Sequence, residues 1–295
     1  MRLNDAINDF LLDQAVRGNS KNTISDYRTK LTFFARYAGN VDVTNITLIS
    51  CKRYYLYLCD KNSNTVTVQT YIRSLRAFLK WLYLEEYIEE DICHKFKLPK
   101  ARQMVITPLT DMEIRSIFAL YPDDTELHIR NRLILALMLD CGLRLNEVVG
   151  ARLDKLFLDE RCMVVTGKGN KQRAIAFGIN TEDLIRRYLN LRKSHSNLLL
   201  IKVSGDGLGE GITENTIKDM FRKIKKNSGV TRLYPHLLRH TFGTRYIENG
   251  GNMFSLQLLL GHTSLNMVKR YVHLANSKIR QEFVNFSPLD RIGGP

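Results

Sequence analysis

Apolar side chains recur every three to four residues through the first part of the chain, which is the period of an amphipathic α-helix. One such stripe includes Tyr27 and Phe34 and follows a polar segment, residues 22–26, that is typical of a helix start with Thr23 as its cap. A longer stripe predicts a second helix from about Val66 to Tyr87. This part of the chain is therefore expected to be helical.

Helical periodicity returns further along the chain. Thr110–Glu113 is a cap signature, and a strongly apolar helix is predicted over residues 130–140, ended by Gly142. Helices are expected again from about residue 215, with breaks at Gly229 and Pro235.

Between these helices the apolar period shortens to two residues, which is typical of strands. Strands are predicted at Cys162–Thr166 and Ala174–Phe177, joined by the turn-forming run Gly167–Asn170. The expected fold is therefore mainly α, with a small antiparallel β-sheet in the C-terminal part.

The length and composition narrow the class of protein. The chain has 295 residues, which favours two domains, and 44% hydrophobic and 25% charged residues, which is an ordinary globular composition. The longest strictly apolar run, Leu133–Leu139, is far shorter than the roughly 20 residues of a membrane helix. Asp5 and Asp9 lie where an export signal would be basic and then apolar, and the five scattered cysteines form no CxxC pair. We expect a soluble cytoplasmic protein with no membrane association.

Charge adds a candidate partner. Lys and Arg number 44 against 30 Asp and Glu, so the formal net charge is +14. Residues 1–98 carry 14 basic and 11 acidic side chains, whereas the rest of the chain carries 30 and 19. Such an excess favours a polyanionic partner, with nucleic acid the first choice, although a solvated basic face is the plain alternative.

Two groups of cations are candidate DNA contacts. The predicted domains are residues 1–98 and 108–295, joined by a linker over 99–107 in which Pro99 stops a helix. Around this boundary several cations follow one another with no acid between them, which fits either a solvated linker or a strap across a phosphate backbone: Lys95, Lys97, Lys100 and Arg102. A second row lies on one face of the predicted helix over 66–87 and either faces solvent or contacts DNA: Arg73, Arg76 and Lys80.

Four short clusters further along carry residues suited to chemistry. Each has an ordinary explanation when taken alone, such as a surface ion pair, a turn lysine or a packed tyrosine. His236 and His240 also have the spacing of a metal-binding pair, but no HExxH-type base and no nearby carboxylate ligand accompany them. The clusters are Arg144 with Glu147; Lys168 in the predicted turn; His236, Arg239 and His240; and His262 with Tyr271.

Taken together, these residue types fit phosphodiester cleavage without a metal or other cofactor. Two guanidinium forks such as Arg144 and Arg239 can bind the non-bridging oxygens of a phosphate and neutralise charge in its transition state. A phenol such as Tyr271 supplies an oxygen nucleophile that holds the phosphate covalently. A lysine can protonate the departing 5′-oxygen, and histidine donors complete an anion cage.

At these residues the sequence resembles the tyrosine recombinases, also called the phage integrase or XerC/XerD-like family. The four clusters recur in the family's order, and the resemblance covers essentially the whole chain. Its spacings are also similar: Lys168 follows Arg144 by 24 residues, Arg239 follows His236 by three, and Tyr271 follows His262 by nine. The resemblance implies a helical, SAM-like core-binding domain, a linker and a catalytic domain that together form a C-shaped clamp on DNA.

The resemblance also implies a role for each residue. Tyr271 is similar to the nucleophile, and Lys168 to the lysine that acts as general acid toward the 5′-hydroxyl. Arg144 and Arg239 match the phosphate-binding pair, His236 the general acid/base, and His262 a donor to the transition state. Glu147 and His240 match positions that support the site.

The implied reaction is strand cleavage and rejoining through a 3′-phosphotyrosyl intermediate and a Holliday junction, on two DNA sites. The implied assembly is a homotetramer on DNA, in which a C-terminal helix docks on a neighbouring protomer, and a monomer or weak oligomer when free; the alternative is a helix that folds back on its own domain. A type IB topoisomerase and a catalytically silent DNA-binding regulator are the competing functions. Integration of a mobile element and chromosome dimer resolution are both open as the biological role.

Overall fold

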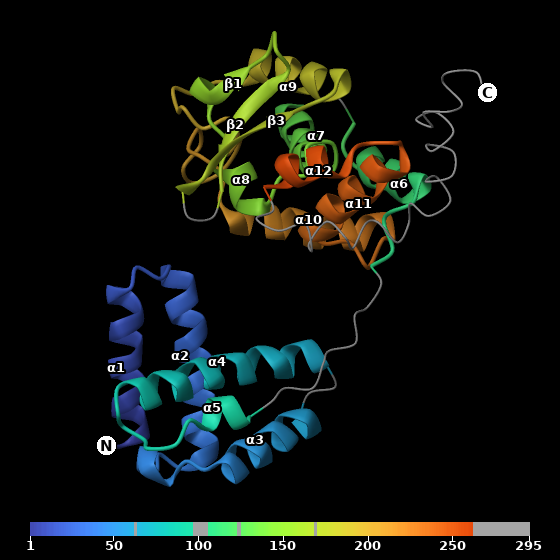
Figure 1. The fold of residues 1–295 in the computed structure, drawn as a ribbon. Helices are drawn as coiled ribbons and strands as arrows, with labels where there is room; N and C mark the ends of the chain where they lie inside the picture. The colour runs from blue at the N-terminus through green and yellow to red at the C-terminus, as the bar shows by residue number, and fades with distance from the viewer. Residues whose placement is uncertain (62–63, 97–105, 123–124, 168–169, 262–295) are drawn as a thin grey trace, which may run out of the picture. The chain divides into compact units, whose positions relative to one another are not determined.

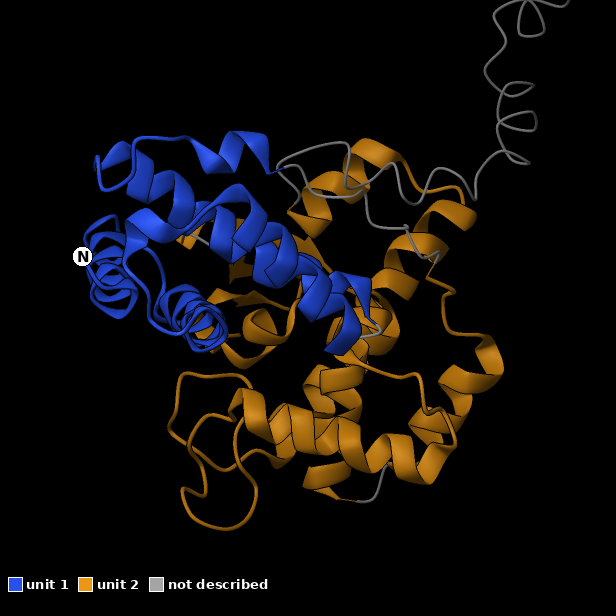
Figure 2. Cartoon of the chain, turned by 90° about the horizontal axis from the view of Figure 1, so that it is seen from below, with its two compact units in different colours: residues 1–104 blue, residues 105–295 orange. Residues whose placement is uncertain are grey.

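A computed structural model describes residues 1–61, 64–96, 106–122, 125–167 and 170–261 of the chain. The chain divides into two compact units, residues 1–104 and 105–295, which Figure 2 shows in different colours. Of the helices that are described, none combines the length and apolar character needed to cross a membrane.

Unit 1 is helical, as the periodicity predicts (Figure 1). Its core is rich in aromatic side chains: the Phe10 ring meets Phe78 and Trp81 edge-to-face, with both pairs of ring centroids 5.6 Å apart. The apolar stripe of the helix predicted from Val66 packs into this core, because its residues share one face: Leu75, Phe78, Leu79 and Leu82 are buried and Tyr71 is partly buried. The elements are α1 (Leu3–Val16), α2 (Lys21–Ala38), η1 (Val43–Asn45), α3 (Leu48–Lys61), α4 (Thr65–Leu84) and α5 (Ile92–Lys95).

The starts of two helices differ slightly from the predicted ones. The N-cap of α2 is Ser20 rather than Thr23, and the Ser20 hydroxyl accepts a hydrogen bond from the Thr23 backbone N–H at 3.2 Å. Asn64 caps α4 by accepting from the Val66 N–H at 2.9 Å, and this helix ends at Leu84. A cap can lie on any of several neighbouring polar residues, so the stripe predicts the helix better than its first residue.

Unit 2 combines helices with one small sheet (Figure 1). Thr110 caps its first helix in a capping box with Glu113, which confirms the sequence-based cap. The helices are α6 (Asp111–Ala119), α7 (Glu126–Leu139), α8 (Leu145–Val149), η2 (Leu153–Lys155), α9 (Ile179–Leu191), α10 (Glu214–Ser228), α11 (Pro235–Glu248) and α12 (Met253–Leu260). The strands are β1 (Leu156–Phe157), β2 (Cys162–Thr166) and β3 (Gln172–Ala176).

The sheet is antiparallel with the order β1-β2-β3, and Met163 on β2 pairs with Ile175 on β3. The β2 strand has the predicted bounds. The β3 strand begins at Gln172, two residues earlier than predicted, and neither β1 nor α9 was expected from the sequence. Two residues are too few to show an alternating pattern, which explains why β1 was missed.

The helix α7 forms the centre of unit 2. It is apolar on nearly all sides and buried from Leu133 to Met138, because α9 and α11 both pack against it. The sheet adds Met163, Val165 and Ile175 to the same core. This shared core fixes the segments that carry Arg144 and Arg239 relative to each other.

Candidate active site

A sharp turn between α7 and α8 places Arg144. Gly142 in this turn has a φ of +63°, and a Cβ atom there would lie 2.5 Å from the Phe242 ring, so only glycine fits. Arg144 follows as the N-cap residue of α8, and its side chain is 31% exposed. The turn therefore presents a guanidinium group at the surface of unit 2.

Arg239 lies on α11 and is almost fully buried, with 5% of its surface exposed. Its guanidinium group donates to two carbonyl oxygens, those of Gly142 at 2.5 Å and Leu260 at 2.6 Å. These bonds join α11 to the turn before Arg144 and to the end of α12. The two arginines, 95 positions apart in the chain, thus share one small region.

Glu147 connects the arginines. This carboxylate is 3% exposed and accepts hydrogen bonds from the Arg144 backbone N–H at 2.8 Å and from Arg144 Nη1 at 2.9 Å. Arg173, on β3, forms a two-pronged ion pair with Glu147: its Nη1 and Nη2 donate to Oε1 and Oε2 at 2.6 and 2.8 Å. Arg239 Nη1 is 4.0 Å from Glu147 Oε2. We call Arg144, Glu147, Arg173 and Arg239 the arginine cluster.

The electrostatics of the arginine cluster favour an anion. Burial alone would raise the pKa of Glu147, but the hydrogen bonds from Arg173 and Arg144 and the charges of both groups outweigh it, so the pKa is lowered. Glu147 is therefore ionised at neutral pH and balances one of three guanidinium charges. The remaining positive charge suits a phosphate, which planar guanidinium groups bind with paired hydrogen bonds.

His236 lies beside this cluster. Its ring is exposed, one turn before Arg239 on α11. Partial desolvation of the ring, together with the positive charges of Arg239 and Arg144, lowers the pKa of His236 from its ordinary value of 6.5. The imidazole is therefore mainly neutral at pH 7, which is the form that accepts a proton.

His240 has a different environment. Its Nε2 is 2.9 Å from the Ile106 carbonyl oxygen, and the neighbouring Thr241 hydroxyl accepts from the Leu109 N–H at 3.0 Å. These bonds fasten the segment before α6 to α11. His240 therefore contacts the backbone of this segment, and its supporting role in the site stays a prediction.

Three predicted catalytic residues, Lys168, His262 and Tyr271, and the predicted C-terminal docking helix lie outside the described residues. The residues just before two of them are described and lie at the arginine cluster. A Cβ atom on Gly167 would be 3.3 Å from Glu147 Oε1, and one on Gly261 would be 3.0 Å from Arg173 Cδ.

Sequence reasoning missed Arg173. A signal was present, because strand residues two apart share a face and Arg173 is two positions from the buried Ile175. A charged residue on the buried face of a strand needs a buried partner. Without the fold, nothing in the sequence identifies that partner as Glu147, 26 positions earlier.

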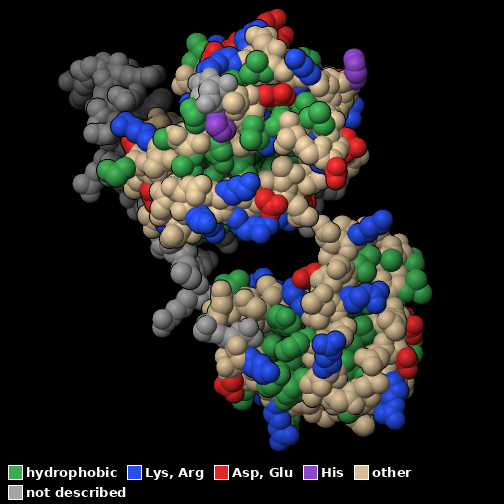
Figure 3. Space-filling model, turned by 180° about the vertical axis from the view of Figure 1, so that it is seen from behind, with side chains coloured by type: hydrophobic (Ala, Val, Ile, Leu, Met, Phe, Trp, Pro, Cys, Tyr) green, Lys and Arg blue, Asp and Glu red, His purple; other side chains and the backbone are tan. Residues whose placement is uncertain are grey.

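The predicted DNA contacts differ in their surroundings. Arg73 is exposed and its Nη2 donates to Gln69 at 3.4 Å, and Arg76 is half-buried. Lys80 and Lys95 pair with carboxylates, Asp91 at 2.8 Å and Glu90 at 2.6 Å. Lys97, Lys100 and Arg102 lie outside the described residues. On the face shown in Figure 3, Lys and Arg side chains are spread over each unit with only small groups of Asp and Glu among them.

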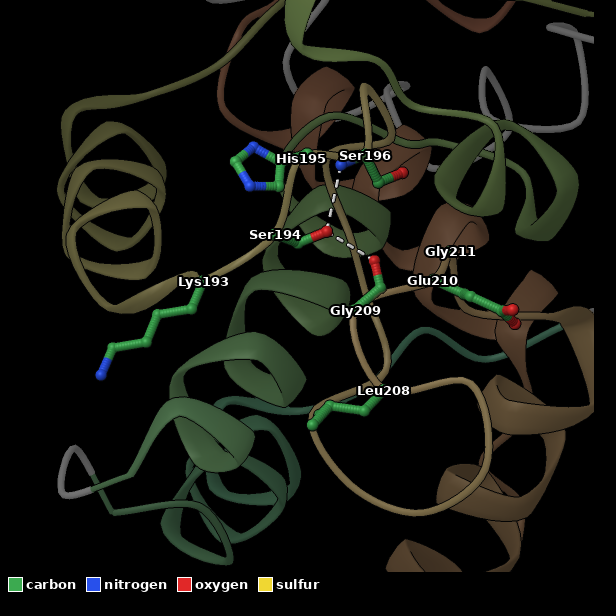
Figure 4. A pocket seen from close by; sticks show the side chains of 8 residues that line it. All are labelled: Lys193, Ser194, His195, Ser196, Leu208, Gly209, Glu210 and Gly211. Carbon is green, nitrogen blue, oxygen red and sulfur yellow. Dashed lines mark hydrogen bonds between the residues drawn. The ribbon is translucent and has the colours of Figure 1, made fainter.

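A surface pocket lies elsewhere in unit 2, between the segment after α9 and the loop before α10 (Figure 4). It has a volume of about 560 Å³ and shares no residue with the arginine cluster. The Ser194 hydroxyl donates to the Gly209 carbonyl oxygen and accepts from the Ser196 N–H at 3.1 Å. Both bonds are made within the protein and stabilise the loop before α10. Within the described ranges, no three His, Cys, Asp or Glu side chains come together in a way that could hold a metal ion.

Family models match both units of the chain. Residues 108–278 match the Phage integrase family, and residues 7–86 match the phage integrase N-terminal SAM-like domain. The chain belongs to this family and is a tyrosine recombinase, an enzyme of site-specific DNA recombination.

Curated relatives cover nearly the whole chain. Tyrosine recombinase XerC of Listeria monocytogenes is 31% identical over 292 residues, which is 92% of this chain and 93% of the relative. Tyrosine recombinase XerC of Staphylococcus carnosus is 29% identical over 91% of this chain and 92% of the relative. The sequence-based recognition of the family is confirmed.

Solved structures share the fold. The Tn1549 transposon integrase in complex with a circular intermediate DNA has a TM-score of 0.76 at 20% identity, covering 94% of this chain and 99% of that chain. A lambda integrase dimer bound to a COC′ core site has a TM-score of 0.76 at 17% identity, covering 92% and 95%. The predicted fold class, mainly helical with a small antiparallel sheet, is confirmed.

Proposed function

We propose that this recombinase cleaves and rejoins double-stranded DNA through a covalent bond to Tyr271. The observation that carries the proposal is the arginine cluster, in which Arg144 and Arg239 converge on one carboxylate and leave positive charge in excess. Paired guanidinium groups bind a phosphate through strong, charge-assisted hydrogen bonds.

In the proposed reaction, the Tyr271 oxygen attacks a backbone phosphorus and the bond to the 5′-oxygen breaks. His236, neutral at pH 7, accepts the phenolic proton, and Lys168 gives a proton to the departing 5′-oxygen. Arg144 and Arg239 neutralise the non-bridging oxygens in the pentacoordinate transition state, and His262 donates a further hydrogen bond. The products are a 3′-phosphotyrosyl enzyme and a free 5′-hydroxyl.

The reverse reaction rejoins the strands. The 5′-hydroxyl of a partner strand attacks the phosphotyrosyl bond and releases the tyrosine, and two such rounds pass through a Holliday junction. Because the ester to Tyr271 retains the bond energy, the proposal needs no ATP, cofactor or metal.

We also propose the organisation and setting of the reaction. Residues 1–98 act as the core-binding domain, 99–107 as the linker and 108–295 as the catalytic domain, and the two domains clamp the DNA. Four copies act on two DNA sites through the C-terminal helix, in the cytoplasm. The role is integration or excision of a mobile element, or chromosome dimer resolution.

Trapping a covalent adduct on nicked suicide DNA tests the proposed chemistry. We expect the natural protein to form the adduct and Tyr271→Phe to lose it while binding the same DNA. An adduct that persists in Tyr271→Phe would overturn the assignment of the nucleophile. Plasmid relaxation without recombination of a two-site substrate would favour a type IB topoisomerase, and absence of any adduct would favour a DNA-binding regulator.

A further inference from the structure

We propose that Arg173 is a positioning residue for the phosphate-binding arginines, and that it acts by holding and neutralising the carboxylate of Glu147. The inference rests on the proposed function, because it assumes that Arg144 and Arg239 bind the DNA phosphate. It concerns a residue that lies outside the four clusters identified from the sequence.

The first support is geometric. Glu147 has two carboxylate oxygens, and Arg173 donates to both, at 2.6 and 2.8 Å. The same oxygens also accept from Arg144, one from its backbone N–H and the other from its Nη1. Arg173 therefore fixes the plane of the carboxylate, and the carboxylate fixes the direction of the Arg144 side chain.

The second support is a shared anchor at the end of α12. Arg173 Nε donates to the Leu259 carbonyl oxygen at 2.7 Å, and Arg239 Nη2 donates to the next one, Leu260, at 2.6 Å. Carbonyl groups in the last turn of a helix lack partners within the helix. Two guanidinium groups satisfy neighbouring carbonyls here, so displacement of Arg173 also disturbs the anchor of Arg239.

The third support is the balance of charge. The Glu147 side chain is 2% exposed and that of Arg173 is 12% exposed, so water contributes little to the stability of this carboxylate. If Arg173 were removed, the nearest cations among the described residues would be Arg144 at 2.9 Å and Arg239 at 4.0 Å. The carboxylate would then compete with the DNA phosphate for the two groups that the reaction needs.

A positioning role for Arg173 has different consequences from those of an ion pair that only stabilises the fold. Loss of an ion pair that only stabilises the fold would lower the free energy of unfolding and leave the cleavage rate of the folded enzyme unchanged, whatever the charge of Glu147. A positioning role predicts that the loss of activity depends on that charge. The variants Arg173→Gln, Glu147→Gln and their combination separate the two accounts, because coupled residues give effects that do not add.

The experiment measures the rate of adduct formation in a single turnover on nicked suicide DNA at saturating enzyme, together with DNA affinity and the unfolding temperature. We expect Arg173→Gln to slow cleavage by about 10²-fold, the scale of losing one transition-state donor, with DNA affinity changed less than about threefold. In the Glu147→Gln background, the same Arg173→Gln change should slow cleavage by no more than about threefold. The double variant removes both charges of this ion pair, so neither is left buried without its partner, and its cleavage can be compared with that of Glu147→Gln even if Arg173→Gln alone unfolds.

Arg232→Gln is the matched control. Arg232 also forms a two-pronged ion pair, with Glu113 at 2.9 and 2.7 Å, but neither residue contacts the arginine cluster. We expect it to change the unfolding temperature and leave the cleavage rate within about twofold, since it removes no contact to the reacting groups.

The outcomes are distinct. Equal losses from Arg173→Gln with and without the Glu147 charge, or no loss at all, would overturn the inference. Arg144→Ala in the same assay shows whether a negative result contradicts only the role of Arg173 or also the proposed phosphate site. If Arg144→Ala abolishes cleavage while Arg173→Gln does not slow it, only the inference fails; if Arg144→Ala cleaves normally, the proposed phosphate site itself is wrong.

Discussion

Two arginine–glutamate pairs in the described part of unit 2 are each bound through both carboxylate oxygens, but they have different surroundings. Arg232 and Glu113 bind each other through both oxygens, as Arg173 and Glu147 do. All the nitrogens of Arg232 donate within the protein, because Nη1 and Nη2 also bind the Thr107 and Pro108 carbonyl oxygens at 2.6 and 2.8 Å. The Arg232–Glu113 pair fastens the start of the unit and is balanced in charge.

The pair at Glu147 is not balanced, because Arg144 and Arg239 surround the same carboxylate. It is also much less exposed: 12% and 2% for Arg173 and Glu147, against 37% and 25% for Arg232 and Glu113. The comparison teaches that a two-pronged arginine–glutamate pair by itself indicates only a structural role. An excess of cations around one buried carboxylate is what indicates a site for an anion.

The largest expected effect follows from removing a cation from the arginine cluster. Arg144→Ala and Arg239→Ala should each slow adduct formation by about 10²- to 10³-fold, because each removes a donor to the charged transition state. Single-turnover cleavage at saturating enzyme measures this. A loss below about tenfold for both variants would contradict the distinction, because it would indicate that the cations around Glu147 contribute only to the fold, as Arg232 does.

A smaller effect is expected from the turn that aligns the cluster. Gly142→Ala places a Cβ atom 2.5 Å from the Phe242 ring at a φ of +63°, so it should destabilise the unit by about 2 kcal/mol or more and slow cleavage by displacing Arg144. Thermal unfolding and single-turnover cleavage measure the two effects. Gly229→Ala is the matched control: its φ is +75°, but no atom lies within 4 Å, so only the backbone penalty of about 1 kcal/mol is expected and cleavage should be unchanged.

The pH dependence of the cleavage rate tests the proposed role of His236 as the base. Because desolvation and the neighbouring arginines lower its pKa below 6.5, the neutral base is lost only as the pH falls through that lowered value. Cleavage should therefore be constant around pH 7 and decrease below pH 6.5, and His236→Ala should be slower and lack this acidic limb. A limb centred above pH 6.5, or one that persists in His236→Ala, would contradict the assignment.

The smallest effect concerns the balanced pair. The Arg232 guanidinium, opposed by partial burial and aided by Thr110, lowers the pKa of Glu113 from 4.5 to about 2. The ionised form stabilises the fold, so this contribution is complete above pH 4.5 and is lost as the pH falls toward about 2. Unfolding temperature against pH should show a shallower acidic decrease in Arg232→Gln than in the natural protein.

The sequence predicted what depends on local pattern. Several predicted features depend only on residues a few positions apart in the sequence, and all of them are present: the apolar stripes of α2 and α4, the capping box at Thr110 and the strand β2. Pro235 was expected to break a helix and instead begins α11 at its first position, where the missing N–H has no cost.

The rest of the site depends on contacts between distant residues. The convergence of Arg144 and Arg239 on Glu147 joins positions 95 apart, and periodicity carries no information about such a contact. It was expected only through the family resemblance. Neither the local sequence pattern nor the family resemblance identified Arg173, because its proposed role depends on its contact with Glu147, which only the fold reveals.

The central claim is that the guanidinium groups at Glu147 bind the phosphate that is cleaved. A crystal structure of Tyr271→Phe with nicked suicide DNA measures this directly. The account predicts nitrogen atoms of both Arg144 and Arg239 within about 2.7–3.2 Å of the non-bridging oxygens of one phosphate. A DNA complex in which that phosphate lies away from both arginines, beyond about 6 Å, would contradict it.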